Sequence, residues 1–212
     1  LVEQPGRKTR PNPDAGDTPG SVRRRSRRVV ENALAHFCGS RDRHARTRHP
    51  DIRLDRLERG QKRVVEMSDE EWSRVLDITL TGTFRMTRAM LPAMQARGRG
   101  TIVNNASVLG WRAQKEQAHY AAAKAGVMAL TRCAALEAAE YGVRINAVSP
   151  SIALHDFLKK ASSEELLARL AGREAFGRAA EVWEVANVMV FLASDYASYM
   201  TGEVLSVSSQ HA

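Results

Sequence analysis

The amino-acid sequence predicts an α/β fold in which helices cover both faces of a parallel sheet. From residue 64 onward, short β-type runs alternate with longer helical patterns, which is the order that a parallel sheet requires. Hydrophobic residues make up 43% of the 212 residues, enough for a sizeable core. The longest uninterrupted apolar run covers only residues 188–193, so no membrane span is predicted.

Charge divides the chain after Arg63. Residues 1–63 contain 17 Lys and Arg against 8 Asp and Glu, a net charge of +9, whereas residues 64–212 contain 15 against 16, a net charge of −1. The first segment also holds five of the seven prolines and sustains neither a helical nor a strand period. We therefore expect an Arg- and Pro-rich segment over residues 1–60, disordered or irregular, and an ordered part over residues 61–212.

The ordered part should begin with a long helix. Ser68 and Glu71 have the spacing of a capping box, with acidic residues at the positive end of the helix dipole. Pro92 and the glycines that follow it are expected to end this helix. Apolar residues at steps of three and four predict its buried face: Trp72, Val75, Leu76, Leu80, Thr83, Met86 and Met90.

The following elements alternate between strand and helix. A β-type run at residues 101–105 precedes an Ala-rich helix over residues 117–141, for which Gly142 is the expected C-cap. The remaining predicted elements are a strand at 143–148, helices near 161–170 and 181–194, and a strand at 201–207. Cys38 and Cys133 lie outside any metal-ligand or C-x-x-C spacing, so neither a metal site nor a disulfide is predicted.

Three residues carry the chemistry that the sequence suggests. Tyr120 and Lys124 are four residues apart and project from one face of the Ala-rich helix. An ammonium group near a phenol stabilises the phenolate, so we expect the pKa of the Tyr120 phenol to fall below its ordinary value. Ser107 ends the preceding strand, where open α/β sheets form their ligand crevice. Taken alone, the Tyr and Lys spacing is equally compatible with a solvated helix face.

Residues 61–212 resemble the short-chain dehydrogenase/reductase family. Residues 100–108 (GTIVNNASV) are similar to the strand that ends in that family's catalytic Ser, and residues 120–124 (YAAAK) are similar to its Tyr-x-x-x-Lys helix. Residues 143–150 (VRINAVSP) resemble the next strand, and Thr201 and Gly202 resemble the start of the last one. The resemblance implies a Rossmann-like three-layer parallel sheet, here incomplete at its N-terminal half.

The resemblance also implies roles for individual residues. Tyr120 would be the general acid/base, Lys124 would lower its pKa and bind the nicotinamide ribose, and Ser107 would orient the reacting oxygen of the substrate. Hydride would pass to or from NAD or NADP. The sequence does not distinguish between these two cofactors. The expected substrate is a small carbonyl or alcohol compound, and a cytoplasmic homo-oligomer is expected. The implied cofactor contacts are Tyr120, Lys124, Pro150, Ser151 and Ile152.

Four departures from the family pattern qualify these expectations. Thr79 stands where the family has an Asn that supports a water-mediated proton relay. Ser151 replaces the Gly of the usual Pro-Gly, and His155 replaces a Thr that contacts the cofactor amide. Ser208 and Ser209 replace the terminal Asp-Gly.

The N-terminal segment lacks the family's nucleotide-binding signature. Residues 1–63 contain no Thr-Gly-x-x-x-Gly-x-Gly turn, which places backbone N–H groups against the pyrophosphate, and no Asn-Asn-Ala-Gly segment. The chain as written is therefore expected to bind the cofactor weakly or not at all. The composition of the segment, the start at Leu1 and the abrupt change near residues 60–61 favour a fragment or a disrupted reading frame.

Two functional hypotheses follow. Residues 149–153 and the Ser-Ser-Gln-His ending resemble a bacterial subgroup of acyl-carrier and acyl-CoA ketoreductases, so a 3-ketoacyl thioester or a steroid-derived ketone is the expected substrate. The alternative is a non-catalytic remnant, or an Arg-tailed protein that binds nucleic acid or a partner through residues 23–28. Nucleic acid is the less favoured partner because no aromatic residue is interleaved with the arginines.

Overall fold

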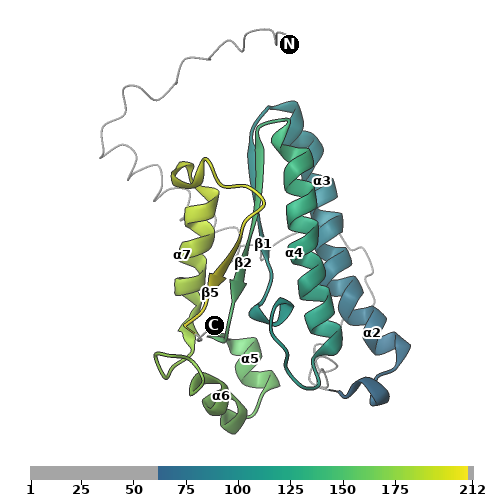
Figure 1. The fold of residues 1–212 in the computed structure, drawn as a ribbon, viewed down its shortest axis with the longest axis vertical. Helices are drawn as coiled ribbons and strands as arrows, with labels where there is room; N and C mark the ends of the chain where they lie inside the picture. The colour runs from purple at the N-terminus through teal and green to yellow at the C-terminus, as the bar shows by residue number, and fades with distance from the viewer. Residues whose placement is uncertain (1–61, 210–212) are drawn as a thin grey trace, which may run out of the picture. The chain divides into compact units, whose positions relative to one another are not determined.

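The structure is a computed structural model that describes residues 62–209 (Figure 1). The expectations for residues 1–60, including the loss of the glycine-rich turn, lie outside the described residues. Three parallel strands form the central sheet in the order β1, β2, β5. Their bounds are β1 (Gly100–Asn105), β2 (Val143–Pro150) and β5 (Val204–Val207). The helices are α2 (Asp69–Leu76), α3 (Gly82–Ala96), α4 (Ala118–Ala139), α5 (Asp156–Ala161), α6 (Glu164–Ala171) and α7 (Val182–Ala193).

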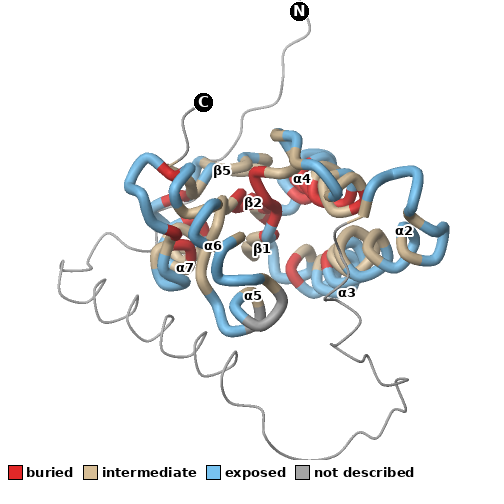
Figure 2. The backbone as a smooth tube through the Cα atoms, turned by 90° about the horizontal axis from the view of Figure 1, so that it is seen from below, coloured by how far each residue is buried: buried red, intermediate tan, exposed pale blue. Residues whose placement is uncertain are grey.

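Helices cover both faces of the sheet, as the sequence predicts. Figure 1 shows α3 and α4 on one side of the strands and α7 on the other, and Figure 2 shows the same layers from below. The register pairs Gly100 with Val143 and Ala147 with Val204, so the carboxyl ends of all three strands lie at one edge. In open α/β sheets that edge carries the ligand crevice.

Strand β2 is buried on both faces, as expected for a central strand of a parallel sheet (Figure 2). Successive side chains point to opposite faces, so Ile145 packs with α3 and α4 while Val148 packs with α7. Asn146 lies between them and is fully buried. Its amide group donates to the Met200 carbonyl oxygen at 2.8 Å and accepts from the Glu203 N–H at 3.0 Å, which satisfies the buried side chain.

The buried face of the first helix differs from the prediction. Trp72, Met86 and Met90 are 39%, 64% and 46% exposed, and Thr87 and Met94 are buried instead. A π-helical segment, Asp77–Thr81, joins α2 to α3. Such a segment holds one residue more per turn than an α-helix. Trp72 precedes this segment, and the better buried positions after it, Thr87, Leu91 and Met94, still recur at steps of four and three. The predicted helical period therefore holds, but a neighbouring stripe of the helix faces the core.

Of the residues predicted to end the first helix, Pro92 does not, because α3 continues through it to Ala96, whereas the glycines after it do. The proline removes one backbone donor without ending the helix. Gly98 follows with φ +67°, a left-handed conformation that glycine adopts readily. The Ala-rich helix agrees closely with expectation, since α4 ends at Ala139 and Gly142 follows with φ +70°.

The C-terminal elements show two further differences. The predicted helix near residues 161–170 corresponds to α6, which begins after Ser163, whose hydroxyl accepts from the Leu166 N–H at 3.2 Å. The short helix α5 before it is not predicted. The last strand begins at Val204 rather than at Thr201. The Thr201 hydroxyl accepts from the Ile145 N–H, and the Gly202 N–H donates to the Ile145 carbonyl oxygen. Residues 201 and 202 are therefore hydrogen-bonded to β2 before β5 begins.

A short parallel pair, β3 (Ala153–Leu154) and β4 (Ala180–Glu181), joins the two ends of the segment that contains α5 and α6. Within the described residues, no helix is both long and apolar enough to cross a membrane.

Candidate active site

Ser107 lies at the carboxyl edge of the sheet, two residues after β1 ends. Its backbone is extended, with φ −164° and ψ 151°, and its hydroxyl accepts from the Leu109 N–H at 3.3 Å. The side chain therefore caps the short 3-10 turn Val108–Gly110 and is held in one position. Ser107 is 9% exposed, so its hydroxyl lies at the base of the edge rather than on the surface.

Tyr120 lies in the first turn of α4, after the N-cap residue Gln117. A hydrogen bond joins its phenol to the Ser107 side chain, and this bond lowers the pKa of the phenol. Burial acts in the opposite direction and more strongly, so the pKa of Tyr120 lies above its ordinary value of 10.0. The structure thus brings Ser107 and Tyr120 together as the sequence predicts.

Lys124 follows one turn later on the same face of α4. Its ammonium nitrogen donates to the Asn105 carbonyl oxygen at 2.6 Å and lies 5.6 Å from the centre of the Tyr120 ring. The residue is 9% exposed, and burial lowers the pKa of the ammonium to about 8. A buried ammonium next to a phenol is the arrangement that the Tyr and Lys spacing suggested.

The expected direction of the Tyr120 pKa is nevertheless wrong for this structure. The sequence predicts that Lys124 lowers it, whereas burial of the phenol dominates and raises it. Lys124 is itself removed from water, and its N–H group is directed at the Asn105 carbonyl oxygen. The four-residue spacing identifies Lys124 as the neighbour of Tyr120, but it does not show how far either group is removed from water. The sequence prediction therefore leaves out the effect of lost hydration on the pKa.

The predicted cofactor residues at the end of β2 lie at the same edge of the sheet. Pro150 is the last residue of β2, and the Ser151 N–H donates to the Val207 carbonyl oxygen at 3.2 Å. The Ile152 carbonyl oxygen accepts from the Ala180 N–H at 2.9 Å. The segment 150–152 is therefore held by β5 on one side and by β4 on the other.

Two departures from the family pattern lie in or next to helices of the structure, and only His155 acts there through its side chain. Thr79 lies inside the π-helical segment, and its carbonyl oxygen accepts from the Thr83 hydroxyl at 2.7 Å. His155 is the N-cap of α5, where its Nδ1 atom accepts from the Leu158 N–H at 3.2 Å.

Sequence reasoning missed Glu174, a buried carboxylate that accepts from Ser151 and Ser209 at the ends of β2 and β5. No spacing rule could find it, because 23 residues separate it from Ser151 and 35 from Ser209. From the sequence, His119 next to Tyr120 is interpreted as a surface histidine rather than as a substrate contact, but the structure buries it at 4% exposure. Burial lowers the pKa of the His119 imidazole, while the Glu71 carboxylate opposes that shift.

The chain is similar to reductases of known sequence. It is 71% identical over 153 residues to (5R,7aS)-5-hydroxy-7a-methyl-1-oxo-2,3,5,6,7,7a-hexahydro-1H-indene-carboxyl-CoA reductase of Mycobacterium tuberculosis, covering 72% of this chain and 58% of that protein. It is 41% identical over 145 residues to the 3-oxoacyl-(acyl-carrier-protein) reductase of Vibrio cholerae, covering 68% of this chain and 59% of that protein. The chain thus spans somewhat more than half the length of these relatives.

Solved structures agree with the fold. A short chain dehydrogenase from Mycobacterium smegmatis is 63% identical, with a TM-score of 0.61 over 72% of this chain and 56% of that one. Levodione reductase is 33% identical, with a TM-score of 0.67 over 72% of this chain and 62% of that one. The family model described as enoyl-(acyl carrier protein) reductase matches residues 55–209. This match takes in the whole candidate site, and the chain belongs to the short-chain dehydrogenase/reductase family.

Proposed function

We propose that residues 61–212 are the catalytic part of an NAD- or NADP-dependent oxidoreductase that interconverts a carbonyl and a hydroxyl group. One observation carries the proposal. Ser107 and Tyr120 lie together at the carboxyl edge of the sheet, where the Ser107 side chain lowers the pKa of the phenol, and the buried Lys124 ammonium lies 5.6 Å from the centre of the phenol ring. A hydroxyl, a phenol and an ammonium in this order supply a hydrogen-bond donor, a proton and a positive charge to one reacting oxygen.

The substrate that we propose is a ketone on a CoA or acyl-carrier thioester, including a ring ketone derived from a steroid. Support comes from the names of the relatives. The Mycobacterium tuberculosis protein is a reductase of a carboxyl-CoA ester that carries ring oxygens, and the Vibrio cholerae protein is a reductase of 3-oxoacyl groups on a carrier protein. Both names combine a thioester carrier with a reducible oxygen.

In the reductive direction, Ser107 donates a hydrogen bond that orients the substrate carbonyl oxygen, and Tyr120 transfers its phenolic proton to that oxygen. Burial of the Tyr120 phenol disfavours its ionised form, so the group is held protonated until the oxygen accepts charge. The Lys124 ammonium then stabilises the phenolate that remains. The reduced nicotinamide cofactor, when bound, would supply the hydride that adds to the carbonyl carbon.

The residues at the sheet edge fit the nicotinamide end of such a cofactor. Lys124 is buried with an acidic N–H group suited to a ribose hydroxyl, and the segment 150–152 is fixed in place beside β5. Lys124, Pro150, Ser151 and Ile152 would hold that end of the cofactor. The part of the chain that would hold the pyrophosphate in the family lies outside the described residues.

The test is reduction of acetoacetyl-CoA by NADH and by NADPH, followed by the absorbance of the reduced cofactor. We expect Tyr120→Phe to lose at least about a hundredfold in kcat, the usual size of a general-acid contribution. Tyr141→Phe is the matched control, because Tyr141 is 48% exposed at the far end of α4. Equal rates for Tyr120→Phe and the unaltered chain would contradict the proposal.

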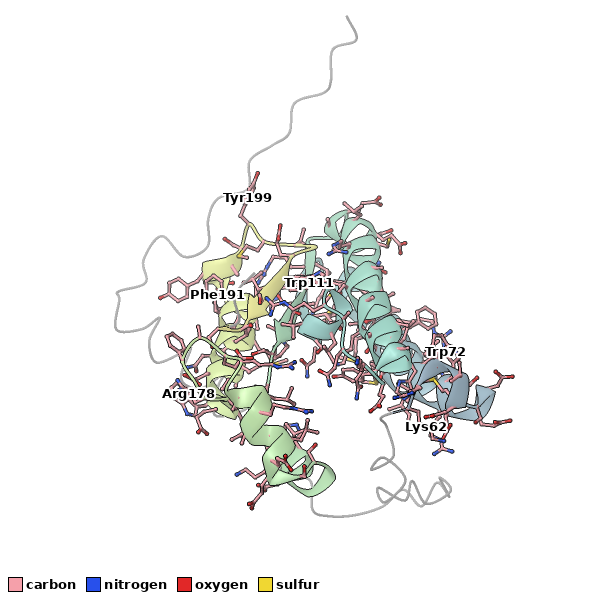
Figure 3. All side chains as sticks on the ribbon, turned by 60° about the horizontal axis from the view of Figure 1, so that its bottom comes forward. Lys62, Trp72, Trp111, Arg178, Phe191 and Tyr199 are labelled. Atoms are coloured by element: carbon pink, nitrogen blue, oxygen red, sulfur yellow. The ribbon has the colours of Figure 1, made fainter. Side chains whose placement is uncertain are left out.

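We also propose that the active form is a homo-oligomer. Apolar side chains remain exposed along α3 and α4: Phe84 at 42%, Met86 at 64%, Met90 at 46% and Leu136 at 76%. Aromatic and apolar side chains are exposed on the α7 side as well, where Phe191 and Tyr199 point away from the ribbon (Figure 3). Light scattering coupled to size exclusion measures the oligomeric state, and a monomer at micromolar concentration would contradict this proposal.

A further inference from the structure

A buried carboxylate links the ends of two strands at the edge where the candidate site lies. Glu174 is 5% exposed and follows α6. Its Oε2 atom accepts from the Ser151 hydroxyl at 3.0 Å, from the Ser209 hydroxyl at 3.0 Å and from the Ser209 N–H at 3.2 Å. Hydrogen bonds to a charged acceptor are stronger than those between neutral groups. Ser151 follows β2 and Ser209 follows β5, so one oxygen atom joins both strand ends.

Backbone hydrogen bonds surround this contact. The Ala175 N–H donates to the Ser209 carbonyl oxygen at 2.8 Å, and the Ser151 N–H donates to the Val207 carbonyl oxygen at 3.2 Å. On the other side, the Ala180 N–H donates to the Ile152 carbonyl oxygen at 2.9 Å. The Glu174 carboxylate is therefore enclosed by the two strand ends and by the chain that returns from α6.

The two serines are both departures from the family pattern. Ser151 stands where the resemblance gives the Gly of Pro-Gly, and Ser209 stands where it gives the Gly of the terminal Asp-Gly. Both hydroxyls donate to the same oxygen of Glu174. A buried carboxylate without hydrogen-bond donors is costly, and glycines would supply no side-chain donor. Two substitutions that look unrelated in the sequence thus belong to one set of contacts.

We propose that Glu174 is a positioning residue that fixes the segment 150–152 through Ser151 and Ser209. The segment is the part of the chain that we assign to the nicotinamide end of the cofactor, so its cofactor role rests on the proposed function. The positioning itself rests on the contacts of Glu174 alone. Loss of the carboxylate frees the Ser151 side chain and separates the end of β2 from the turn that follows α6.

Amide hydrogen exchange of the full chain, followed by NMR, tests the positioning directly. In Glu174→Ala we expect exchange at Ser151, Ala175 and Ser209 to accelerate by about tenfold or more, the size of one lost hydrogen bond to a charged group. The exchange rate at Ile145, inside β2, should stay within about threefold of its rate in the unaltered chain. Glu174→Gln keeps an acceptor oxygen of the same reach and should restore most of the protection. Glu137→Ala removes an exposed carboxylate from α4 and should change none of these rates.

A second set of variants covers the case in which Glu174→Ala does not fold. In the double variant Ser151→Ala with Ser209→Ala, the carboxylate loses both hydroxyl donors, so the melting temperature should fall. Adding Glu174→Val to that pair should raise the melting temperature again, because the stranded carboxylate is gone. The same Glu174→Val change in the unaltered chain should lower it. If Glu174→Val changes the melting temperature by the same amount in the unaltered chain and in the double variant, the three residues do not act together. That result would overturn the inference.

Kinetics separate positioning from general stability. In Glu174→Ala, KM for the reduced nicotinamide cofactor should rise by about tenfold or more while kcat changes less than about threefold, because Ser107, Tyr120 and Lys124 are untouched. A fall in kcat alone would contradict a role in holding the segment. Local exchange that is unchanged in Glu174→Ala would overturn the inference whatever the activity. If exchange responds as expected but the unaltered chain reduces no ketone, the proposed function fails and the positioning stands.

Discussion

The ammonium nitrogen of Lys124 lies 2.6 Å from the carbonyl oxygen of Asn105, so a charged side chain of α4 is joined to the last residue of β1. This contact fixes the start of α4 against the strand end from which Ser107 extends. It also places the charge in a site where the residue is only 9% exposed, which lowers the pKa of the ammonium from 10.5 to about 8. The energetic cost of that burial is measurable.

Lys124→Met should change how stability depends on pH. Below pH 8 the lysine is charged in both states, so the folded state bears the full cost of the buried charge. Between pH 8 and 10.5 the folded state loses its proton before the unfolded state does, and the stability of the unaltered chain should rise by about 3 kcal/mol relative to Lys124→Met. Urea unfolding at several pH values measures the difference.

Lys115→Met serves as the control for this titration, because Lys115 is exposed. Its unfolding free energy should run parallel to that of the unaltered chain over the whole range. Parallel curves for Lys124→Met would show that the ammonium is not desolvated in the folded state.

Ser107→Ala should raise the pKa of the Tyr120 phenol further. The Ser107 hydrogen bond lowers this pKa, and burial, which raises it, remains in the variant. The tyrosinate absorbance during an alkaline titration reports the change, with Tyr120→Phe subtracted to isolate the single phenol. A lower midpoint in Ser107→Ala would mean that the hydroxyl does not stabilise the phenolate.

Ile145→Ala should destabilise the chain by about 2–5 kcal/mol, since Ile145 is fully buried at the centre of β2. Val65→Ala removes a branched side chain that is 92% exposed and lies outside the apolar surface assigned to the oligomer, and its cost should stay within about 0.5 kcal/mol. Urea unfolding of both variants checks the contrast. An equal loss of unfolding free energy in the two variants would contradict the position of Ile145 in the hydrophobic core.

Gly142→Ala and Gly98→Ala form a matched pair. Both glycines have a positive φ, +70° and +67°, so either alanine is strained by about 1–2 kcal/mol. A Cβ atom at Gly142 would also lie 2.8 Å from the Gly98 carbonyl oxygen, whereas one at Gly98 would meet nothing within 4 Å. Thermal unfolding should therefore show the larger loss for Gly142→Ala. The reverse order would contradict the close approach of the two turns.

The sequence predicts the layers, the order of the elements and the proximity of Ser107, Tyr120 and Lys124, because each depends on short-range patterns. The capping box at Ser68, the β-type run before Ser107 and the four-residue step from Tyr120 to Lys124 are all local. The buried face of α3 is predicted incorrectly, because steps of three and four residues give the helical period but not which of two neighbouring stripes faces the core. Thr87 and Met94 are buried where Met86 and Met90 are expected. Glu174 escapes prediction for another reason, since its partners are distant in sequence and meet only in the folded sheet.

The short pairing of β3 with β4 has a consequence for how the segment that contains α5 and α6 can vary in length. Ala153 pairs with Ala180, so residues 155–179 leave the sheet and return to it at neighbouring points. Loop-closure entropy changes slowly with loop length, by about 0.6 kcal/mol for a doubling. Insertions or deletions within α5 and α6 would therefore leave the strand ends nearly undisturbed. Under the proposed function, related proteins can vary α5 and α6 to suit a larger or smaller ketone as long as Glu174, which joins the two strand ends, is kept.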